Sequence, residues 1–324
     1  METVNVGRSG LRVSRLCLGT MIFGRQLDEP AAFAVMDRAR ELGIDFFDTA
    51  DVYPVPPAPE TWGRTEEVVG RWRRNRGESV TVATKCVNRV GPGSNDLGGG
   101  RKHVIEACEA SIRRLQLERL DVFYLHHSDL GAPTEEALEA LDRLVEAGKV
   151  HYIGVSNFEA WQVGLAMALA AERRLARITI VQPRYNLLNR VYERELLPLC
   201  RAAGLGVAPY NPLGAGMLTG KYRRGAQPPE ESRFGWGTYG LMYQRRYWSD
   251  RMFDVAEAVE AVGQEVGASP AAVALAWLLA QPDVTSPVVG ASRPEQLADS
   301  VRALDVHLAR EHLDRLAEVS QPFV

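Results

Sequence analysis

Four residues of this sequence have side chains that together can move a proton to a carbonyl oxygen: Asp48, Tyr53, Lys85 and His126. A tyrosine is a poor acid at neutral pH, because its free pKa is about 10. A nearby ammonium such as that of Lys85 stabilises the phenolate, and a carboxylate keeps the lysine charged. With an imidazole to orient the oxygen or relay the proton, the set can protonate a carbonyl oxygen while hydride reaches its carbon.

Taken singly, each of these residues has a structural interpretation. Asp48 could cap the loop that follows it, Lys85 could be a solvated charge, and Tyr53 could be an ordinary core or surface aromatic. His127, next to His126, is an alternative imidazole. The chemical interpretation therefore depends on elements that bring the four side chains to one place.

The elements expected from the pattern alternate between short apolar runs and amphipathic helices. Two clear helices are expected over 101–115 and 134–146, where apolar residues recur on one face. Eight strands are expected, at 15–18, 46–48, 80–84, 122–125, 152–155, 178–181, 207–208 and 285–289. Eight repeats of strand and helix predict a (β/α)8 barrel, a single domain over 1–324, preceded by a hairpin over 4–13 that turns at 8–10. Such barrels carry their chemistry at the carboxyl ends of the strands, where Asp48, Lys85, His126, Ser156, Gln182 and Tyr210 stand.

Two long loops depart from a bare barrel. Residues 54–62 are rich in proline, and residues 211–249 are rich in glycine and aromatic residues. Loops of this length in a compact domain are usually lids or binding loops.

Composition excludes several classes of protein. The net charge of −3 gives no reason to expect nucleic acid, and no apolar run is long enough to span a membrane. The four cysteines have no metal-ligand or CxxC spacing, and no signal peptide is indicated, so we expect buried thiols, no metal and a cytoplasmic location. The sequence leaves open whether the chain forms a homo-oligomer.

Two familiar nucleotide-binding patterns are missing. The glycine-rich runs at 91–96 and 214–219 each fail the dinucleotide fingerprint at its last position, and 216–222 is one residue short of a P-loop. A nicotinamide cofactor would have to bind at the mouth of the barrel instead.

The motifs at these strand ends resemble those of the aldo-keto reductase superfamily, from about Gly7 to Val301. The subgroup of potassium-channel β subunits and bacterial reductases is the most similar. The resemblance is carried by 47–53 (FDTADVY), 83–85 (ATK), 121–126 (DVFYLH), 154–158 (GVSNF), 181–182 (VQ), 185–188 (YNLL) and 210–214 (YNPLG).

This resemblance implies a catalytic tetrad in which Tyr53 is the general acid, supported by Asp48, Lys85 and His126. It also implies NADPH as cofactor, with Arg233 and Arg293 flanking the adenosine 2′-phosphate. The resemblance implies these residues as cofactor contacts: Gly19, Thr20, Met21, Asp48, Ser156, Asn157, Gln182, Tyr210, Asn211, Pro212, Leu213, Gly214, Gly216, Lys221, Arg233, Gly290, Ser292, Arg293, Gln296, Asp299 and Ser300.

Residues 290–297 also read as a helix start. Ser292 and Glu295 predict a capping box with Pro294 in the first turn, and a helix N-terminus beside Arg293 is a suitable anion site. Ser156 and Glu159 predict a second box.

The sequence departs from the family pattern at several points. Asp299-Ser300 replaces the more usual Glu-Asn pair, Asn211 stands where serine is commoner, and the long C-terminal substrate loop of steroid and sugar reductases is missing. The loops 54–62 and 211–249 are therefore expected to shape the substrate pocket.

The expected function is NADPH-dependent reduction of a ketone or aldehyde. The high usage of Arg, Ala, Gly and Pro suggests a GC-rich bacterium, and a polyketide or deoxysugar ketone of secondary metabolism is one candidate substrate. A Schiff-base aldolase using Lys85 is disfavoured, because Asp48 and Tyr53 favour a charged lysine. A cofactor-sensing regulatory subunit with slow turnover, as in channel β subunits, is the main alternative.

Overall fold

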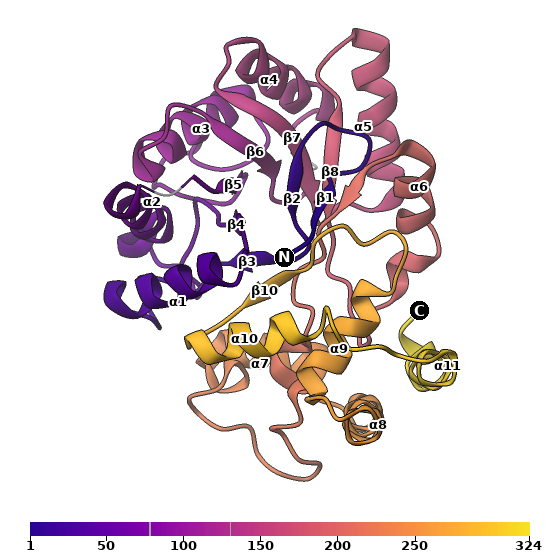
Figure 1. The fold of residues 1–324 in the computed structure, drawn as a ribbon. Helices are drawn as coiled ribbons and strands as arrows, with labels where there is room; N and C mark the ends of the chain where they lie inside the picture. Colours follow the sequence, from indigo (N-terminus) through magenta and orange to yellow (C-terminus); the bar gives the residue numbers. More distant parts are fainter. Residues whose placement is uncertain (78, 130) are drawn as a thin grey trace.

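The computed structural model describes residues 1–77, 79–129 and 131–324, and its centre is a barrel of eight parallel strands (Figure 1). The order is β10-β3-β4-β5-β6-β7-β8-β9, and a bridge between Tyr210 and Val288 closes the ring. The strands are β3 (Cys17–Gly19), β4 (Phe46–Asp48), β5 (Thr81–Cys86), β6 (Leu120–Leu125), β7 (Val150–Ser156), β8 (Ile178–Gln182), β9 (Gly206–Val207) and β10 (Val288–Gly290). The predicted barrel is confirmed, and each predicted apolar run contributes a strand.

Helices cover the outside of the barrel, with α1 to α6 around one side and α8 to α10 on the other (Figure 1). Their bounds are α1 Glu29–Glu41, α2 Arg64–Arg76, α3 Arg101–Leu115, α4 Thr134–Glu146, α5 Ala160–Arg173, α6 Leu196–Ala203, α8 Asp250–Val266, α9 Pro270–Leu279 and α10 Pro294–Arg302. Helices α3 and α4 have the predicted bounds. The chain ends with α11 (Arg310–Val319), which packs against α8, and the short turn η5 (Gln321–Phe323).

Strand β6 shows why the segments predicted to be strands are apolar at successive positions. Val122 and Tyr124 pack inside the barrel, whereas Phe123 and Leu125 face the layer of helices. Because both faces of a parallel strand are covered, side chains of both orientations are apolar.

The N-terminal hairpin of β1 (Thr3–Asn5) and β2 (Arg12–Ser14) closes one end of the barrel, where Val6 and Val13 join the inner core. The turn was expected at 8–10, but the glycine that adopts a left-handed conformation is Gly7 (φ 57°). A Cβ at Gly7 would lie 2.3 Å from the carbonyl oxygen of Gly204, so this position accepts only glycine.

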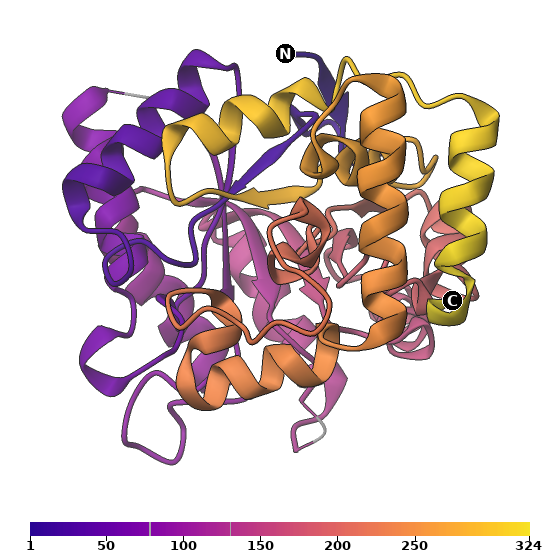
Figure 2. The same ribbon diagram turned by 90° about the horizontal axis from the view of Figure 1, so that it is seen from below.

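The segment 211–249 lies at the opposite end of the barrel from the N-terminus (Figure 2). It was expected as a loop, but it contains the turns η3 (Gly214–Thr219) and η4 (Arg233–Gly235) and the helix α7 (Gly237–Tyr247). The sequence of α7 is rich in glycine and tyrosine, which have modest helix propensity, so packing rather than propensity forms this helix. The other long loop, 54–62, holds only the turn η1 (Pro59–Thr61).

The predicted capping box of Ser292 and Glu295 is wrong. Helix α10 begins at Pro294 with Arg293 as its N-cap residue and without a side-chain cap. Gln296 instead accepts hydrogen bonds through Oε1 from the amide (2.8 Å) and the hydroxyl (3.1 Å) of Ser292.

The second predicted box, of Ser156 and Glu159, is also wrong. Glu159 is itself the N-cap residue of α5, and its amide donates to Gln162 Oε1 at 2.8 Å. Ser156 ends β7, and its hydroxyl donates to the carbonyl of Gln182 on the neighbouring strand at 2.8 Å. The hydroxyl therefore joins two strands rather than capping a helix.

Within the described residues, no single helix has the length and apolar character needed to span a membrane. Helices α8 and α9 taken together have the length and composition of a membrane span, but the pair is bent by 95° and its apolar side chains lie in the core. The four cysteines are buried and unpaired, and no three His, Cys, Asp or Glu side chains of the described ranges could hold a metal ion. The cytoplasmic location, the single domain and the oligomeric state stay predictions.

Candidate active site

An ion pair at the carboxyl ends of β4 and β5 forms the floor of the candidate site. Lys85 Nζ lies 2.6 Å from Asp48 Oδ2 and donates a second hydrogen bond to the carbonyl of Thr49 at 2.8 Å. The side chain of Lys85 is fully buried and that of Asp48 is 5% exposed. Two buried opposite charges in contact hold each other in one position.

Tyr53 lies in the loop after β4, half-buried above this pair. The ammonium nitrogen of Lys85 is 5.2 Å from the centroid of its ring. The ring of His126, directly after β6, packs edge-on against Tyr53 with centroids 5.8 Å apart. The four residues expected to form a tetrad are therefore brought together at one mouth of the barrel.

The protonation state of Tyr53 follows from its surroundings. Burial raises the pKa of Tyr53 well above its usual value, and the carboxylate of Asp48 raises it further, whereas Arg233 opposes the shift. Lys85 was expected to lower the pKa of Tyr53, but the net shift is upward, because the charge of Lys85 is matched by Asp48 at 2.6 Å. The phenol stays protonated at neutral pH, which is the form that donates a proton.

His126 is the imidazole of the site, held in one tautomer by Asn88. Burial lowers the pKa of His126 well below its usual value, and Lys85 and His127 lower it further, so the ring is neutral. Asn88 Nδ2 lies 2.8 Å from His126 Nδ1; because an amide nitrogen only donates, Nδ1 accepts and the ring proton lies on Nε2. His127 is turned to the carbonyl of Ser128 at 2.9 Å.

Asn88 was not among the residues expected from the sequence. It follows Val87, whose φ of 100° is rare for a β-branched residue and redirects the chain after β5. The available signal was a polar residue three positions after the strand-end lysine, which is too common a pattern to single out.

A second buried acidic group was also missed. Asp51 is fully buried two residues before Tyr53, and its amide donates to the carbonyl of Lys85 at 3.1 Å. Burial raises the pKa of Asp51 well above its usual value, and Glu66 raises it further. Glu66 is itself held by Arg114 Nε at 2.6 Å. Asp51 therefore holds its proton more tightly than a free carboxyl group does.

A chain of amide and hydroxyl groups extends from Asp48 along the ends of β7 and β8. Gln182 Nε2 donates to Asp48 Oδ1 at 2.8 Å, and Asn157 Nδ2 donates to the hydroxyl oxygen of Ser156 at 3.0 Å. Tyr210 completes the chain by donating to Asn157 Oδ1 at 2.7 Å. The resemblance implies these residues as cofactor contacts, and they form one connected surface beside the tetrad.

On the side of β3, Thr20 and Met21 are fixed by the loop after β4. Thr20 donates through its hydroxyl to the carbonyl of Asp48 at 2.8 Å, and the carbonyl of Met21 accepts from the amide of Val55 at 3.1 Å. At Gly19 a Cβ would lie 2.8 Å from Val288, so a side chain would not fit there.

The chain after β9 turns sharply at Gly214, Ala215 and Gly216, which all have positive φ (55°, 58° and 98°). Asn211 stabilises this turn by accepting a hydrogen bond through Oδ1 from the amide of Ala215 at 2.8 Å. Pro212 and Leu213 lie between them. The ammonium of Lys221 lies against Gly216, where a Cβ would come within 3.1 Å of Nζ.

Three cations from separate segments meet at this side of the mouth. Burial lowers the pKa of Lys221, and Arg233 and Arg293 lower it further, so the three charges are near one another. Arg233 also lies beside Gly290 at the end of β10. In the part of the chain that the structure describes, none of the three forms a hydrogen bond or an ion pair. Unmatched cations beside a helix N-terminus form a suitable site for phosphate groups.

The expected adenine contacts on α10 are engaged within the protein. Asp299 accepts hydrogen bonds from the hydroxyl of Ser269 at 2.9 and 2.8 Å, and Ser300 donates to the carbonyl of Gln296 at 2.9 Å. Their contacts with a cofactor stay predictions.

The chain is similar in sequence to several known proteins. Residues 15–321 match the sequence profile described as "Aldo/keto reductase family". The "Uncharacterized oxidoreductase YrpG" of Bacillus subtilis (strain 168) is 38% identical over 98% of this chain and 96% of its own. A "Probable voltage-gated potassium channel subunit beta" of Oryza sativa subsp. japonica is 37% identical over 99% and 97%. The "L-glyceraldehyde 3-phosphate reductase" of Escherichia coli (strain K12) is 35% identical over 92% and 86%.

Proposed function

The chain belongs to the aldo/keto reductase family of carbonyl-reducing oxidoreductases, and from this premise we propose that it reduces a ketone or an aldehyde to an alcohol with NADPH. The observation that carries the proposal is the cluster of Asp48, Lys85, Tyr53 and His126. It joins a protonated phenol, a buried ion pair and a neutral imidazole at one mouth of the barrel.

In the proposed mechanism Tyr53 donates its phenolic proton to the carbonyl oxygen of the substrate. Lys85, held by Asp48 at 2.6 Å, stabilises the phenolate that remains. His126 directs its Nε2–H toward the same oxygen, because Asn88 occupies Nδ1. The nicotinamide, when bound, supplies the hydride to the carbonyl carbon.

The residues around the mouth fit a nicotinamide cofactor from end to end. We assign the carboxamide to Ser156, Asn157 and Gln182 and the ring face to Tyr210, since these four form the connected surface beside Asp48. The remaining proposed contacts are Gly19, Thr20 and Met21 on one side, the turn of Asn211, Pro212, Leu213, Gly214 and Gly216, and the α10 end with Gly290, Ser292, Gln296, Asp299 and Ser300.

The preference for NADPH over NADH rests on Lys221, Arg233 and Arg293. Three like charges without an internal partner repel one another, so an anion lowers the free energy of this cluster. A pyrophosphate and a 2′-phosphate together supply the negative charge that the cluster lacks.

The proposed substrate is a carbonyl compound that approaches Tyr53 on the side where the segment 211–249 lies. Tyr243 of α7 lies close enough to Tyr53 to raise the pKa of its phenol, and Trp236 and Tyr239 precede it on the same segment. Aromatic side chains of this kind suit a large, partly apolar ketone, such as a polyketide or a deoxysugar derivative in bacterial secondary metabolism.

The test is NADPH oxidation by the purified protein with a panel of ketones and aldehydes, followed by absorbance of the reduced nicotinamide. We expect turnover with at least one compound and loss of turnover in Tyr53→Phe with NADPH affinity nearly unchanged. A Tyr53→Phe variant that keeps most of its kcat would overturn the assignment of the acid. Bound NADPH that stays reduced for minutes beside a reactive aldehyde would instead favour a regulatory subunit; the rice relative is a probable voltage-gated potassium channel subunit beta.

A further inference from the structure

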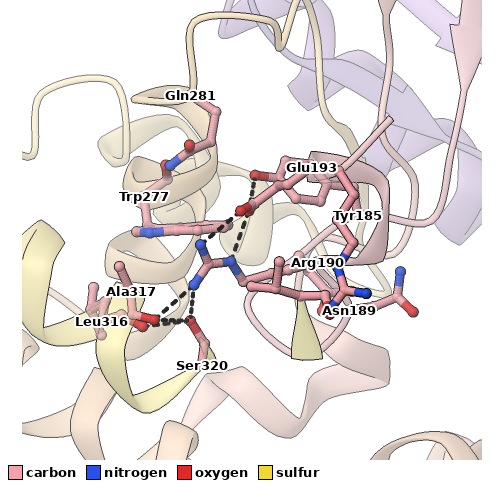
Figure 3. Close-up of polar contacts among 12 residues, drawn as sticks. Tyr185, Asn189, Arg190, Glu193, Trp277, Gln281, Leu316, Ala317 and Ser320 are labelled. Carbon is pink, nitrogen blue, oxygen red and sulfur yellow. Dashed lines mark hydrogen bonds and ion pairs between the residues drawn. The ribbon is translucent and has the colours of Figure 1, made fainter. Parts of the chain in front are cut away.

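Outside the site, Arg190 is the centre of a partly buried polar cluster that joins the end of the chain to the loop after β8 (Figure 3). All three nitrogen atoms of its guanidinium donate hydrogen bonds. Nε and Nη2 form a bidentate pair with Glu193 (2.8 Å each), and Nη1 donates to the carbonyl of Ala317 and the hydroxyl of Ser320 (2.8 Å each). The guanidinium also lies 5.4 Å from the ring of Trp277. A side chain with this many directed contacts has one position.

The last residues of the chain provide the other half of this contact. The amide of Arg190 donates to the carbonyl of Phe323 at 2.7 Å, and Arg194 Nη2 donates to the carbonyl of Val324 at 2.8 Å. The turn η5 and the end of α11 therefore anchor the segment around Arg190, although they lie more than 120 residues away in sequence.

The same cluster fixes the start of the loop after β8. Glu193 Oε1 accepts a hydrogen bond from the hydroxyl of Tyr185 at 2.7 Å, in addition to that from Arg190. Tyr185 is fully buried and packs on Trp277 with ring centroids 5.8 Å apart. Residues 185 to 190 are thus held at both ends.

This held segment in turn supports the cofactor side of the site. The carbonyl of Pro183 accepts from the amide of Tyr210 at 2.9 Å, and Asn186 Nδ2 donates to the carbonyl of Asn211 at 2.8 Å. Asn211 has a left-handed conformation (φ 58°) and donates to the hydroxyl of Tyr247 in α7 at 3.0 Å. The contact of Asn186 comes from the segment that Arg190 anchors, that of Pro183 comes from two residues before it, and Asn211 extends the chain of contacts to α7.

We propose that Arg190 is a positioning residue for cofactor binding. It fixes residues 185–190, and through Asn186 it holds Asn211, which stabilises the turn at Gly214, Ala215 and Gly216, and with it α7. The proposal rests on the proposed NADPH-dependent function for its binding consequence. Its structural part, the ordering of the turn, does not depend on that function.

The test compares Arg190→Met with Leu197→Ala, a control in the neighbouring helix α6. Leu197 is buried and forms none of these hydrogen bonds, so its truncation lowers stability without removing a member of the polar cluster. Conditions are chosen so that both variants have the same melting temperature. Hydrogen exchange of the cofactor-free proteins is measured over 183–190, 210–222 and 237–247, and the Kd for NADPH is measured by fluorescence titration.

For Arg190→Met we expect faster exchange in all three segments, a Kd for NADPH raised about fivefold or more, and a kcat at saturating NADPH within about twofold of wild type. For Leu197→Ala we expect neither change. Arg190→Lys, which keeps the charge but not the bidentate pair, should fall between wild type and methionine. Equal exchange in the two variants, or a Kd unchanged in Arg190→Met, overturns the proposal. If wild type itself does not bind NADPH, the proposed function fails, whereas the exchange result still decides the role of Arg190.

Discussion

Replacing Lys85 by methionine removes one partner of a fully buried ion pair, and its effect on stability can be worked out from the structure. Asp48 would keep its hydrogen bond from Gln182 (2.8 Å) but lose its charge partner at 2.6 Å. Removal of one member of a buried pair costs about 3–5 kcal/mol, because the other charge stays buried without compensation. Since Gln182 remains, we expect a loss in the free energy of unfolding of about 3 kcal/mol.

Turnover should fall in the same variant for a different reason. The phenolate of Tyr53 would lose its cation, so the general-acid contribution, about 100-fold or more, would be lost as in Tyr53→Phe. Tyr53 is half-buried, and we expect Tyr53→Phe to cost less than about 1 kcal/mol of stability. The two variants should therefore be similar in kcat and different in stability.

A compensating change separates the two effects. In Lys85→Met/Asp48→Asn the remaining partner is neutral, so most of the lost stability should return while turnover stays low. Urea unfolding gives the free energies, and NADPH oxidation with the best carbonyl compound gives kcat. The reasoning is refuted if the double variant regains turnover together with stability, because loss of activity would then be a consequence of unfolding.

Three further predictions concern ionisable groups in and around the site. Changing Arg233 and Arg293 together to alanine should weaken NADPH binding by about 100-fold or more and leave NADH binding nearly unchanged in fluorescence titrations, since two charge-assisted hydrogen bonds of about 1.5–3 kcal/mol each are lost; equal losses would contradict a 2′-phosphate site. Asn88→Asp should raise the pKa of His126, now well below its usual value, so that kcat/KM falls on acidification at a higher pH than in wild type; superimposable pH profiles would disprove this. The raised pKa of Asp51 means that the folded protein binds the proton of this carboxyl group more tightly than the unfolded chain does. Stability therefore falls as the pH rises from the usual carboxyl pKa toward the raised pKa of the folded state. Asp51→Asn should reduce this slope in melting temperatures measured between pH 5 and 8, and an unchanged slope would assign it to other groups.

Much of the fold is determined by local pattern. Phe46-Phe47 and the run at 122–125 are apolar on both faces, as suits a covered parallel strand, and the apolar stripes of 101–115 and 134–146 predict helices with the observed bounds. Because the carboxyl ends of barrel strands meet at one mouth, the strand-end positions of Asp48, Lys85 and His126 were enough to expect a shared site.

Where local signals compete, the pattern was less reliable. Ser292 stands two residues before a proline and three before a glutamate, which is the pattern of a capping box. The amide of Ser292 instead donates a hydrogen bond to the side chain of Gln296. Helix α7 has weak intrinsic propensity, and its tyrosines find partners such as Asn211 that lie far away in sequence.

Only the tertiary structure decided which groups share an environment. The tautomer of His126 depends on Asn88, which another strand end delivers at 2.8 Å, and the protonation of Asp51 depends on burial beside Glu66. The position of the loop after β8 depends on contacts between Arg190 and the last residues of the chain, which are more than 120 positions apart. Periodicity reports how each segment faces the core, but burial, desolvation and hydrogen-bond partners are properties of pairs of segments, and these exist only once the barrel has closed.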